Sequence, residues 1–158
     1  MPEPAPSFIL QSRRMALQTG KQAPNIKSAS FDLAKLRGKT VVIFFFPKAD
    51  TPGCTAQACS LRDSYDDLRT KGLQIIGVSE DKAEAQKKFQ EKYKLPFSLV
   101  ADVDGSVAKA FGVPALGGFA KRQSFLIKDG KIVWRDLNAS TKNQAADVRQ
   151  ALANLTPK

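Results

Sequence analysis

Continuous apolar runs alternate with amphipathic stretches along the chain. The runs TVVIFFFP (40–47) and LQIIGVS (73–79) are rich in β-branched and aromatic residues. A continuous apolar run, rather than an alternating one, indicates a strand that is covered on both faces, as in a parallel sheet. Residues 52–71 have helical spacing, and Gly72 is suited to end that helix as a C-terminal cap. This part of the chain therefore predicts a β-α-β unit.

The remaining pattern continues the alternation of strands and helices. It predicts a helix over 82–92, a strand over 97–102, a short helix within 104–113, two strands within 122–137 and a last helix over 144–155. Asp129-Gly130 joins the two late strands, and this dipeptide is a strong signal for a tight hairpin. The order β-α-β-α-β-β-α predicts an α/β fold in which helices flank a central mixed β-sheet.

The first 19 residues are expected to form an extended N-terminal arm, because they are rich in Pro, Ser and Gln and show little periodicity. Residues 20–158 then form one domain, which suits a chain of 158 residues. The segment SRRMAL (12–17) is similar to a twin-arginine export signal, but polar residues follow where an apolar segment is required. We expect a cytoplasmic protein, with a periplasmic or organellar one as the alternative if a targeting segment has been removed.

The formal net charge of +10 raises the question of a nucleic-acid partner. Basic residues are interleaved with acidic ones, as in EDKAEAQKKFQEKYK (80–94), and no basic-aromatic stripe or nucleic-acid motif is present. We interpret the charge as a solvated basic surface and expect no nucleic-acid partner. No apolar run approaches the roughly 18 residues of a membrane span, so no membrane association is expected.

The absence of histidine restricts the chemistry of this chain. It excludes Cys-His and Ser-His-Asp catalysis and every zinc site that needs an imidazole. Two cysteines cannot complete a structural tetrahedral site without two further protein ligands, so we expect no metal. Any reaction has to use a thiol, a carboxylate, a hydroxyl, Arg or Lys.

Both cysteines lie in TPGCTAQACS (51–60), at the expected start of the first helix. Thr51 is a suitable N-cap residue and Pro52 suits the first helical position. Cys54 then lies in the first turn, where unpaired backbone N–H groups and the positive end of the helix dipole converge. A thiol in this place has its anionic form stabilised, and the thiolate is the nucleophile.

One helical stripe places Cys54 on the apolar side of this helix. The stripe consists of Cys54, Ala58, Leu61, Tyr65 and Leu68. Cys54 therefore points inward at the C-terminal end of a buried strand, where open α/β sheets place their sites. A small buried apolar role is the alternative, but a place in the first turn directly after a strand favours a reactive thiol.

Cys59 lies about 140° around the helix from Cys54, at a Cα separation of about 8.7 Å while the helix is intact. A disulfide needs Cα atoms within about 7 Å. Two interpretations stay open from the residues alone. The two thiols are inert, or they pair after the first turns of the helix unwind.

The segment PKADTPGCT matches the peroxiredoxin pattern Pro-x-x-x-Thr-x-x-Cys, with Pro47, Thr51 and Cys54 at the pattern positions. Together with EKYKLPFSLVADVDGSVAKAFGV and RQSFLI, it resembles the peroxiredoxin Q or bacterioferritin comigratory protein subgroup from about Gly20 to the last helix. The resemblance implies a thioredoxin-like fold. It also implies a thioredoxin-dependent peroxidase that reduces hydrogen peroxide and organic hydroperoxides in antioxidant defence.

The resemblance assigns roles to particular residues. Cys54 aligns with the peroxidatic cysteine, Arg122 with the arginine that supports the thiolate and the peroxide, and Cys59 with the resolving cysteine of some members. Thr51 and the N–H groups near Gly53 and Cys54 are expected to donate hydrogen bonds to the peroxide oxygens. Pro47 is expected to pack beside the thiol and to limit its access to water.

One departure from the family pattern is Gln57, where many relatives have Glu, and it is expected to alter the local charge. The resemblance further implies a sulfenic acid on Cys54, an intramolecular disulfide with Cys59, and thioredoxin or glutaredoxin as the reductant. No metal, haem or flavin is needed, and the subgroup implies a monomer. The alternatives are a general thiol-disulfide oxidoreductase on the same fold and a non-enzymatic basic nucleic-acid or scaffold protein.

Overall fold

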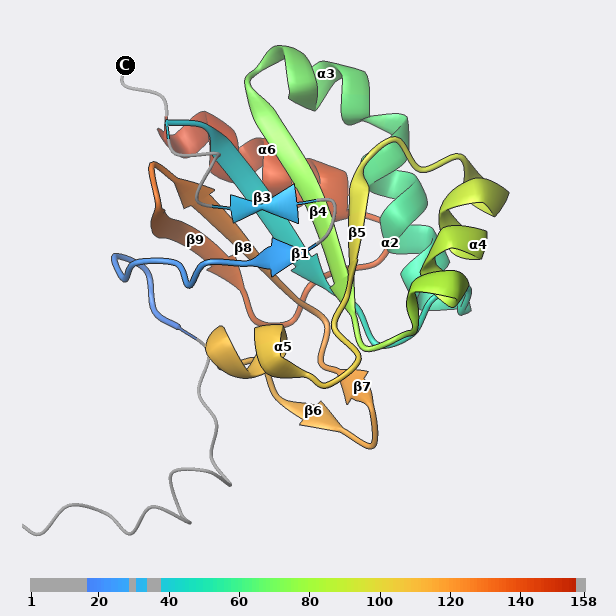
Figure 1. Ribbon diagram of the computed structural model, residues 1–158. Helices are drawn as coiled ribbons and strands as arrows, with labels where there is room; N and C mark the ends of the chain where they lie inside the picture. Colours follow the sequence, from blue (N-terminus) through green and yellow to red (C-terminus); the bar gives the residue numbers. More distant parts are fainter. Residues whose placement is uncertain (1–16, 29–30, 34–37, 156–158) are drawn as a thin grey trace, which may run out of the picture.

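The computed structural model describes residues 17–28, 31–33 and 38–155, which form a layered α/β structure (Figure 1). The central sheet has five strands in the order β5-β4-β3-β8-β9. Their bounds are Ser98–Ala101 (β5), Leu73–Ser79 (β4), Thr40–Phe45 (β3), Gln123–Lys128 (β8) and Lys131–Asp136 (β9). Strands β3, β4 and β5 run parallel, whereas β8 pairs antiparallel with both β3 and β9. The predicted α/β fold with a mixed sheet is confirmed.

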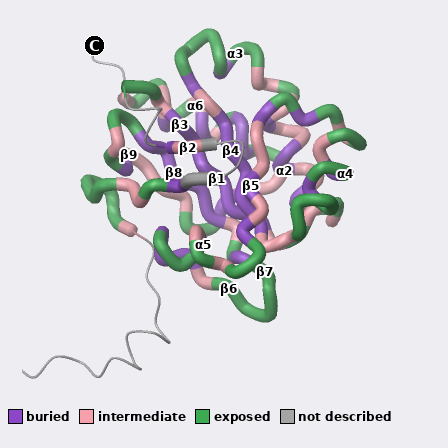
Figure 2. The backbone as a smooth tube through the Cα atoms, in the orientation of Figure 1, coloured by how far each residue is buried: buried purple, intermediate pink, exposed green. Residues whose placement is uncertain are grey.

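Strand β3 lies at the centre and is buried on both faces, as its continuous apolar run predicts. On one face Val42, Phe44 and Phe46 pack with residues of helices α2 (Pro52–Asp63), α3 (Tyr65–Thr70), α4 (Ala83–Tyr93) and α6 (Gln144–Leu155). On the other face Val41, Ile43 and Phe45 pack with residues around the short helix α5 (Ser106–Ala110). Figure 2 shows the buried strands enclosed by half-buried and exposed helices and loops.

The single helix predicted over 52–71 is in fact two helices, α2 and α3, separated at Ser64. Ser64 has φ −105° and ψ 7°, outside the helical range, and its hydroxyl accepts a hydrogen bond from Arg149 of α6. The apolar stripe continues across this break, because Leu61 before it and Leu68 after it are both fully buried. Gly72 follows the end of α3 with a positive φ of 84°, as its predicted capping place requires.

The tight hairpin predicted from Asp129-Gly130 joins β8 to β9, and both residues have positive φ. The last helix has the predicted bounds, and the other predicted strand and helices are present within a few residues. The sequence pattern did not predict four two-residue strands, because such elements are too short to show periodicity. They are β1 (Lys27–Ser28), β2 (Phe31–Asp32), β6 (Ala115–Leu116) and β7 (Phe119–Ala120).

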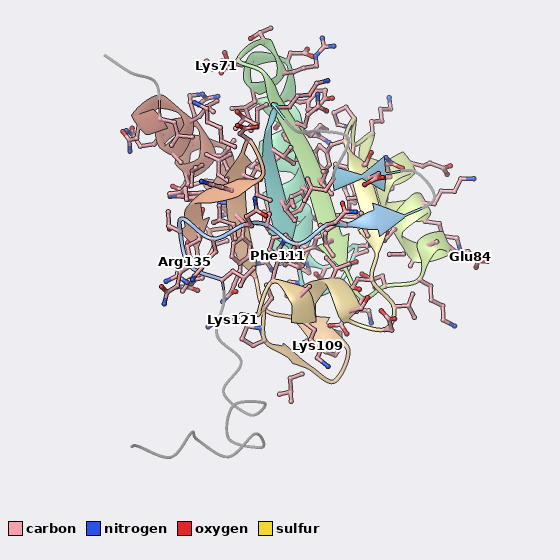
Figure 3. The ribbon with its side chains drawn as sticks, turned by 60° about the vertical axis from the view of Figure 1, so that its left-hand side comes forward. Lys71, Glu84, Lys109, Phe111, Lys121 and Arg135 are labelled. Atoms are coloured by element: carbon pink, nitrogen blue, oxygen red, sulfur yellow. The ribbon has the colours of Figure 1, made fainter. Side chains whose placement is uncertain are left out.

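Residues 1–16 of the predicted arm lie outside the described residues, and the segment that follows them contacts other described parts of the chain. The N–H of Leu17 donates to the carbonyl of Phe111, just after α5, at 2.9 Å. The N–H of Ala23 donates to the carbonyl of Gly130 in the β8–β9 turn, also at 2.9 Å. Figure 3 shows the Phe111 side chain between α5 and the sheet. Gly20 donates to the carbonyl of Ile132 in β9 and Lys21 accepts from the N–H of the same residue, so the chain is held along β9 before it enters β1.

Charged side chains project from well-separated parts of the surface, as Lys71, Glu84 and Lys109 illustrate in Figure 3. Among the phenylalanines, Phe45, Phe46 and Phe125 are buried, whereas Phe119 is 49% exposed. Within the described ranges, no helix has the length and apolar character needed to cross a membrane.

Candidate active site

Cys54 lies in the first turn of α2, directly beyond the C-terminal end of β3, and is 1% exposed. The chain leaves β3 at Phe45, passes the half-buried Pro47 and turns at Asp50, which has a positive φ of 61°. Thr51 is extended, with φ −100° and ψ 156°, and α2 begins at Pro52. The predicted place of the thiol, in the first turn after a buried strand, is confirmed.

Thr51 occupies the N-cap position, but its hydroxyl does not cap the helix. The side chain makes no capping hydrogen bond, and Oγ1 instead donates to the carbonyl of Lys48 at 2.7 Å. The Thr51 carbonyl accepts the first helical hydrogen bond, from the N–H of Thr55 at 2.8 Å. The hydroxyl thus closes the turn before the helix. The N–H groups of the first helical turn accordingly donate no hydrogen bond to the Thr51 side chain.

Arg122 reaches the thiol from the neighbouring strand. It precedes β8, and the antiparallel pairing of Phe45 with Gln123 places the start of β8 beside the end of β3. From there Nη2 of Arg122 lies 3.4 Å from Sγ of Cys54, in hydrogen-bonding contact. A guanidinium at this distance can donate a hydrogen bond to the sulfur, because it is always charged and has no acceptor.

Gly53 leaves the space that this guanidinium occupies. A Cβ at position 53 would lie 2.9 Å from Nη2 of Arg122 and 3.4 Å from a methyl carbon of Thr141. The first distance is shorter than real Cβ contacts, so a side chain here would displace the guanidinium. The glycine next to the thiol thus leaves room for the close approach of Arg122.

A buried polar network continues from Arg122 into the helical layer. Nη1 of Arg122 donates to Oε1 of Gln57 at 2.7 Å, and Nε2 of Gln57 donates to Oε1 of Gln144 at 2.8 Å. The hydroxyl of Ser124 donates to the same Oε1 of Gln144. Sequence reasoning missed Gln144 and Ser124, because a polar residue in a strand or at a helix start gives no sign of being buried.

Cys59 is half-buried and lies on the same helix, which is continuous from Pro52 to Asp63. Both thiols are free. Regular helix geometry separates their Cα atoms by about 8.7 Å, beyond the roughly 7 Å that a disulfide spans. The structure therefore brings Arg122, Gly53 and Cys54 together and leaves Cys59 apart from them.

The turn before α2 is fastened to α4 through Asp50. Its carboxylate accepts hydrogen bonds from Nζ of Lys92 at 3.0 Å and from the hydroxyl of Tyr93 at 3.0 Å. The hydrogen bond from Lys92, followed by that from Tyr93, lowers the pKa of Asp50 below its ordinary value. The same contact raises the pKa of Lys92. Asp50 is thus charged at neutral pH and holds the loop that carries Thr51.

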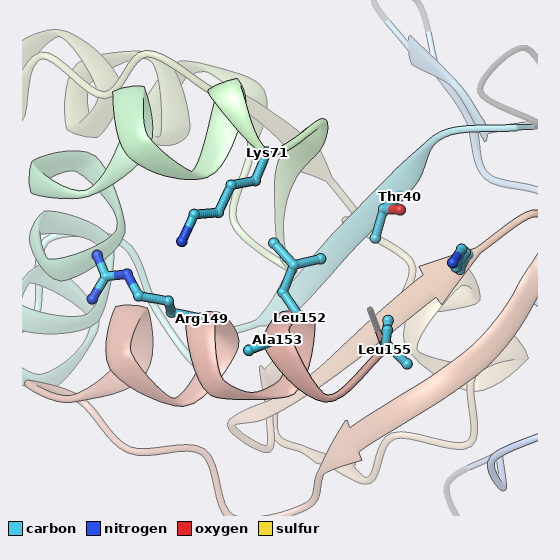
Figure 4. A pocket seen from close by; sticks show the side chains of 7 residues that line it. Thr40, Lys71, Arg149, Leu152, Ala153 and Leu155 are labelled. Atoms are coloured by element: carbon cyan, nitrogen blue, oxygen red, sulfur yellow. The ribbon is translucent and has the colours of Figure 1, made fainter. Parts of the chain in front are cut away.

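No group of three or more His, Cys, Asp or Glu side chains is placed to hold a metal ion in the part of the chain that the structure describes. A pocket of about 540 Å³ lies far from the thiol, between α6 and the start of β3 (Figure 4). Thr40 lines it at the first residue of β3, whereas Cys54 lies beyond the last one. None of the predicted site residues borders this pocket.

Comparisons with known proteins agree on one family. The model of the AhpC/TSA family matches residues 2–135. The putative chloroplastic peroxiredoxin Q of Oryza sativa subsp. indica is 41% identical over 121 residues, which are 72% of this chain and 56% of that protein. The chain thus spans about half the length of this plant relative. Peroxiredoxin Bcp of Bacillus subtilis is 35% identical over 157 residues, covering 91% of this chain and 100% of that protein.

A solved structure supports the same similarity in three dimensions. Peroxidoxin BcpB of Mycobacterium tuberculosis superposes with a TM-score of 0.81 at 29% identity, covering 89% of this chain and 99% of that one. The predicted thioredoxin-like architecture is confirmed by this match.

Proposed function

Since the chain belongs to the AhpC/TSA family, within the peroxiredoxin Q and Bcp group, we propose that it is a thiol peroxidase. Its substrates are hydrogen peroxide and organic hydroperoxides, and Cys54 is the peroxidatic residue. The observation that carries the proposal is the contact of 3.4 Å between Nη2 of Arg122 and Sγ of Cys54 at the start of α2. A thiol held by a guanidinium and a helix N-terminus is prepared to react as a thiolate.

In the first step the Cys54 thiolate attacks one oxygen of the peroxide. A sulfur–oxygen bond forms, the O–O bond breaks, and the departing oxygen takes up a proton and leaves as water or an alcohol. The peroxide is reduced by two electrons, and Cys54 is oxidised to a sulfenic acid. Negative charge moves from sulfur to the departing oxygen, so donors around that oxygen lower the barrier.

The donors for this charge come from the residues around the thiol. Arg122 can donate to a peroxide oxygen beside Sγ, and the N–H groups of Gly53 and Cys54 point out of the first turn. The Thr51 hydroxyl donates to the Lys48 carbonyl in the present state, and it is proposed to turn toward the peroxide when the substrate binds. Pro47, half-buried and without an N–H, limits the access of water.

In the second step the Cys59 thiol attacks Sγ of the Cys54 sulfenic acid and releases water, which leaves a disulfide between the two residues. The first turns of α2 have to unwind, because the intact helix separates the two Cα atoms by about 8.7 Å. Unwinding breaks the contact between Gln57 and Gln144, which ties α2 to α6. Formation of the disulfide therefore competes with the packing of this helix.

An external dithiol, thioredoxin or glutaredoxin, then reduces the disulfide by two electrons and returns both thiols. The cycle uses no metal, haem or flavin, and the protein is proposed to act as a monomer. Measured turnover with each reductant, and the mass of the protein in solution, test these two points.

The decisive experiment is the variant Cys54→Ser. Stopped-flow mixing with hydrogen peroxide should show no reaction of this variant, whereas Cys59→Ser, as the matched control, should react once. Consumption of peroxide by Cys54→Ser at the parent rate would overturn the proposal.

A further inference from the structure

Gln144, the first residue of α6, lies behind the Cys54 site with its side chain fully buried. We infer that Gln144 is a positioning residue, which orients the amide of Gln57 so that its oxygen holds the guanidinium of Arg122. The inference rests on the proposed function, because its main readout is the reaction of Cys54 with peroxide. Gln144 is 87 residues from Gln57 in the chain, and in the part of the chain that the structure describes it makes no hydrogen bond to Cys54 or Arg122.

The order of donors and acceptors in this network follows from chemistry. A guanidinium has donors and no acceptor, so Nη1 of Arg122 requires the oxygen of Gln57 to face it. The Nε2 group of Gln57 then points the other way and needs an acceptor. The Oε1 atom of Gln144 is that acceptor, at 2.8 Å. If the Gln57 amide flipped, its NH₂ group would face the Arg122 donors.

The orientation of Gln144 is itself held by two donors. The Ser124 hydroxyl and the Gln57 amide both donate to its Oε1 atom. Its own Nε2 atom is buried and has no hydrogen-bond partner among the described residues. An unpaired buried NH₂ group is unfavourable. Within the described ranges, the hydrogen bonds of the Gln144 side chain are therefore those that its acceptor oxygen Oε1 receives.

The backbone around Gln144 is fixed independently of its side chain. The N–H of Ala145 donates to Oγ of Ser60 on α2 at 3.1 Å. Ala145 and Val148 bury the same face of α6 in the core. The start of α6 should therefore stay in place when the Gln144 amide is replaced, and the effect should be confined to Gln57 and Arg122.

The test measures the rate of peroxide attack on Cys54 in Gln144→Met, which keeps the length and buried character of the side chain but removes the acceptor. We expect the rate to fall roughly tenfold, as for a weakened charge-assisted hydrogen bond. The matched control is Gln123→Met, because Gln123 is also a buried glutamine, adjacent to Arg122, but donates to the Leu137 carbonyl. The control should keep the parent rate.

A rescue separates positioning from general structural damage. In a Gln57→Glu background both side-chain oxygens accept, so Arg122 cannot meet a misplaced donor there. Gln144→Met should then slow the reaction less than twofold relative to Gln57→Glu alone. Equal slowing in both backgrounds, a parent-like rate for Gln144→Met, or an equal loss in Gln123→Met would each overturn the inference.

Two further measurements keep the test decisive. If Gln144→Met does not fold, Gln57→Met removes the Arg122 partner directly, and a parent-like rate in that variant overturns the inference. If the parent protein does not react with peroxide, the proposed function fails by itself. In that case the rate at which iodoacetamide alkylates Cys54 is measured in a Cys59→Ser background, because this rate depends on the position of Arg122 beside the thiol. An unchanged alkylation rate when Gln144→Met is added to this background overturns the inference.

Discussion

Replacing Gly53 by Ala should slow the peroxide reaction without weakening the fold. The added Cβ would lie 2.9 Å from Nη2 of Arg122, so the guanidinium has to retreat to an ordinary contact of at least 3.4 Å. The methyl carbon of Thr141 also lies 3.4 Å from this Cβ position, at the limit of ordinary van der Waals contact. The hydrogen bond of 3.4 Å between Arg122 and Cys54 is then lost or lengthened.

The magnitude follows from the strength of that hydrogen bond. A hydrogen bond to a charged group is worth about 1.5–3 kcal/mol, and each 1.36 kcal/mol in the barrier is about tenfold in rate. The second-order rate of Cys54 with peroxide should therefore fall about 10- to 100-fold. Gly53 has a helical backbone, where Ala is favoured over Gly by up to about 1 kcal/mol. The free energy of unfolding should stay equal or rise.

Stopped-flow fluorescence and urea unfolding measure the two effects in the same protein. A double-mutant cycle with Arg122→Ala isolates their cause, because the methyl group should have no further effect once the guanidinium is absent. A rate for Gly53→Ala within twofold of the parent would refute the reasoning. An equal loss of rate when Gly53→Ala is added to Arg122→Ala would refute it as well.

The other predictions concern the second thiol and the loop before α2. Cys59→Ser should react once with peroxide and then over-oxidise, since Cys54 has no partner for its sulfenic acid, and intact mass should show sulfinic or sulfonic products. As the pH falls from about 5 to about 2, the free energy of unfolding should decrease less in Asp50→Asn than in the parent. The pKa of Asp50 is lowered from 3.8 by Lys92 and Tyr93, so the stability it contributes is present above that value and is lost as the pH falls through the lowered pKa.

Each of these results has a control. Parent protein treated in the same way should form the disulfide instead of the over-oxidised products. Continued turnover of Cys59→Ser with thioredoxin would contradict a resolving role. For the acid effect, urea midpoints of Asp66→Asn serve as the comparison, because that carboxylate is 93% exposed and its ion pair with Arg69 is long, at 3.8 Å. Equal acid losses in Asp50→Asn and the parent would contradict the contribution of the Lys92 contact.

Several parts of the fold could be predicted because their causes are local. The apolar run of β3 predicts that the strand is buried on both faces, as it is in the structure. The turn at Asp129-Gly130, where both residues have positive φ, depends on two adjacent residues. Other parts could not be predicted, because their causes lie far away in the chain. The break at Ser64 accompanies a contact with Arg149 of α6, and the two-residue strands exist only through their pairing partners.

The candidate site divides in the same way. The sequence by itself determined where Cys54 lies, because a helix start after a buried strand is a local property of Pro52 and of the apolar run before it. A resemblance to a family, rather than local pattern, singled out Arg122. Only the tertiary structure decided that Arg122 reaches Cys54, and that Gln144 stands behind Gln57. These contacts span 68 and 87 residues, and sheet register and helix packing, which no local pattern encodes, bring them together.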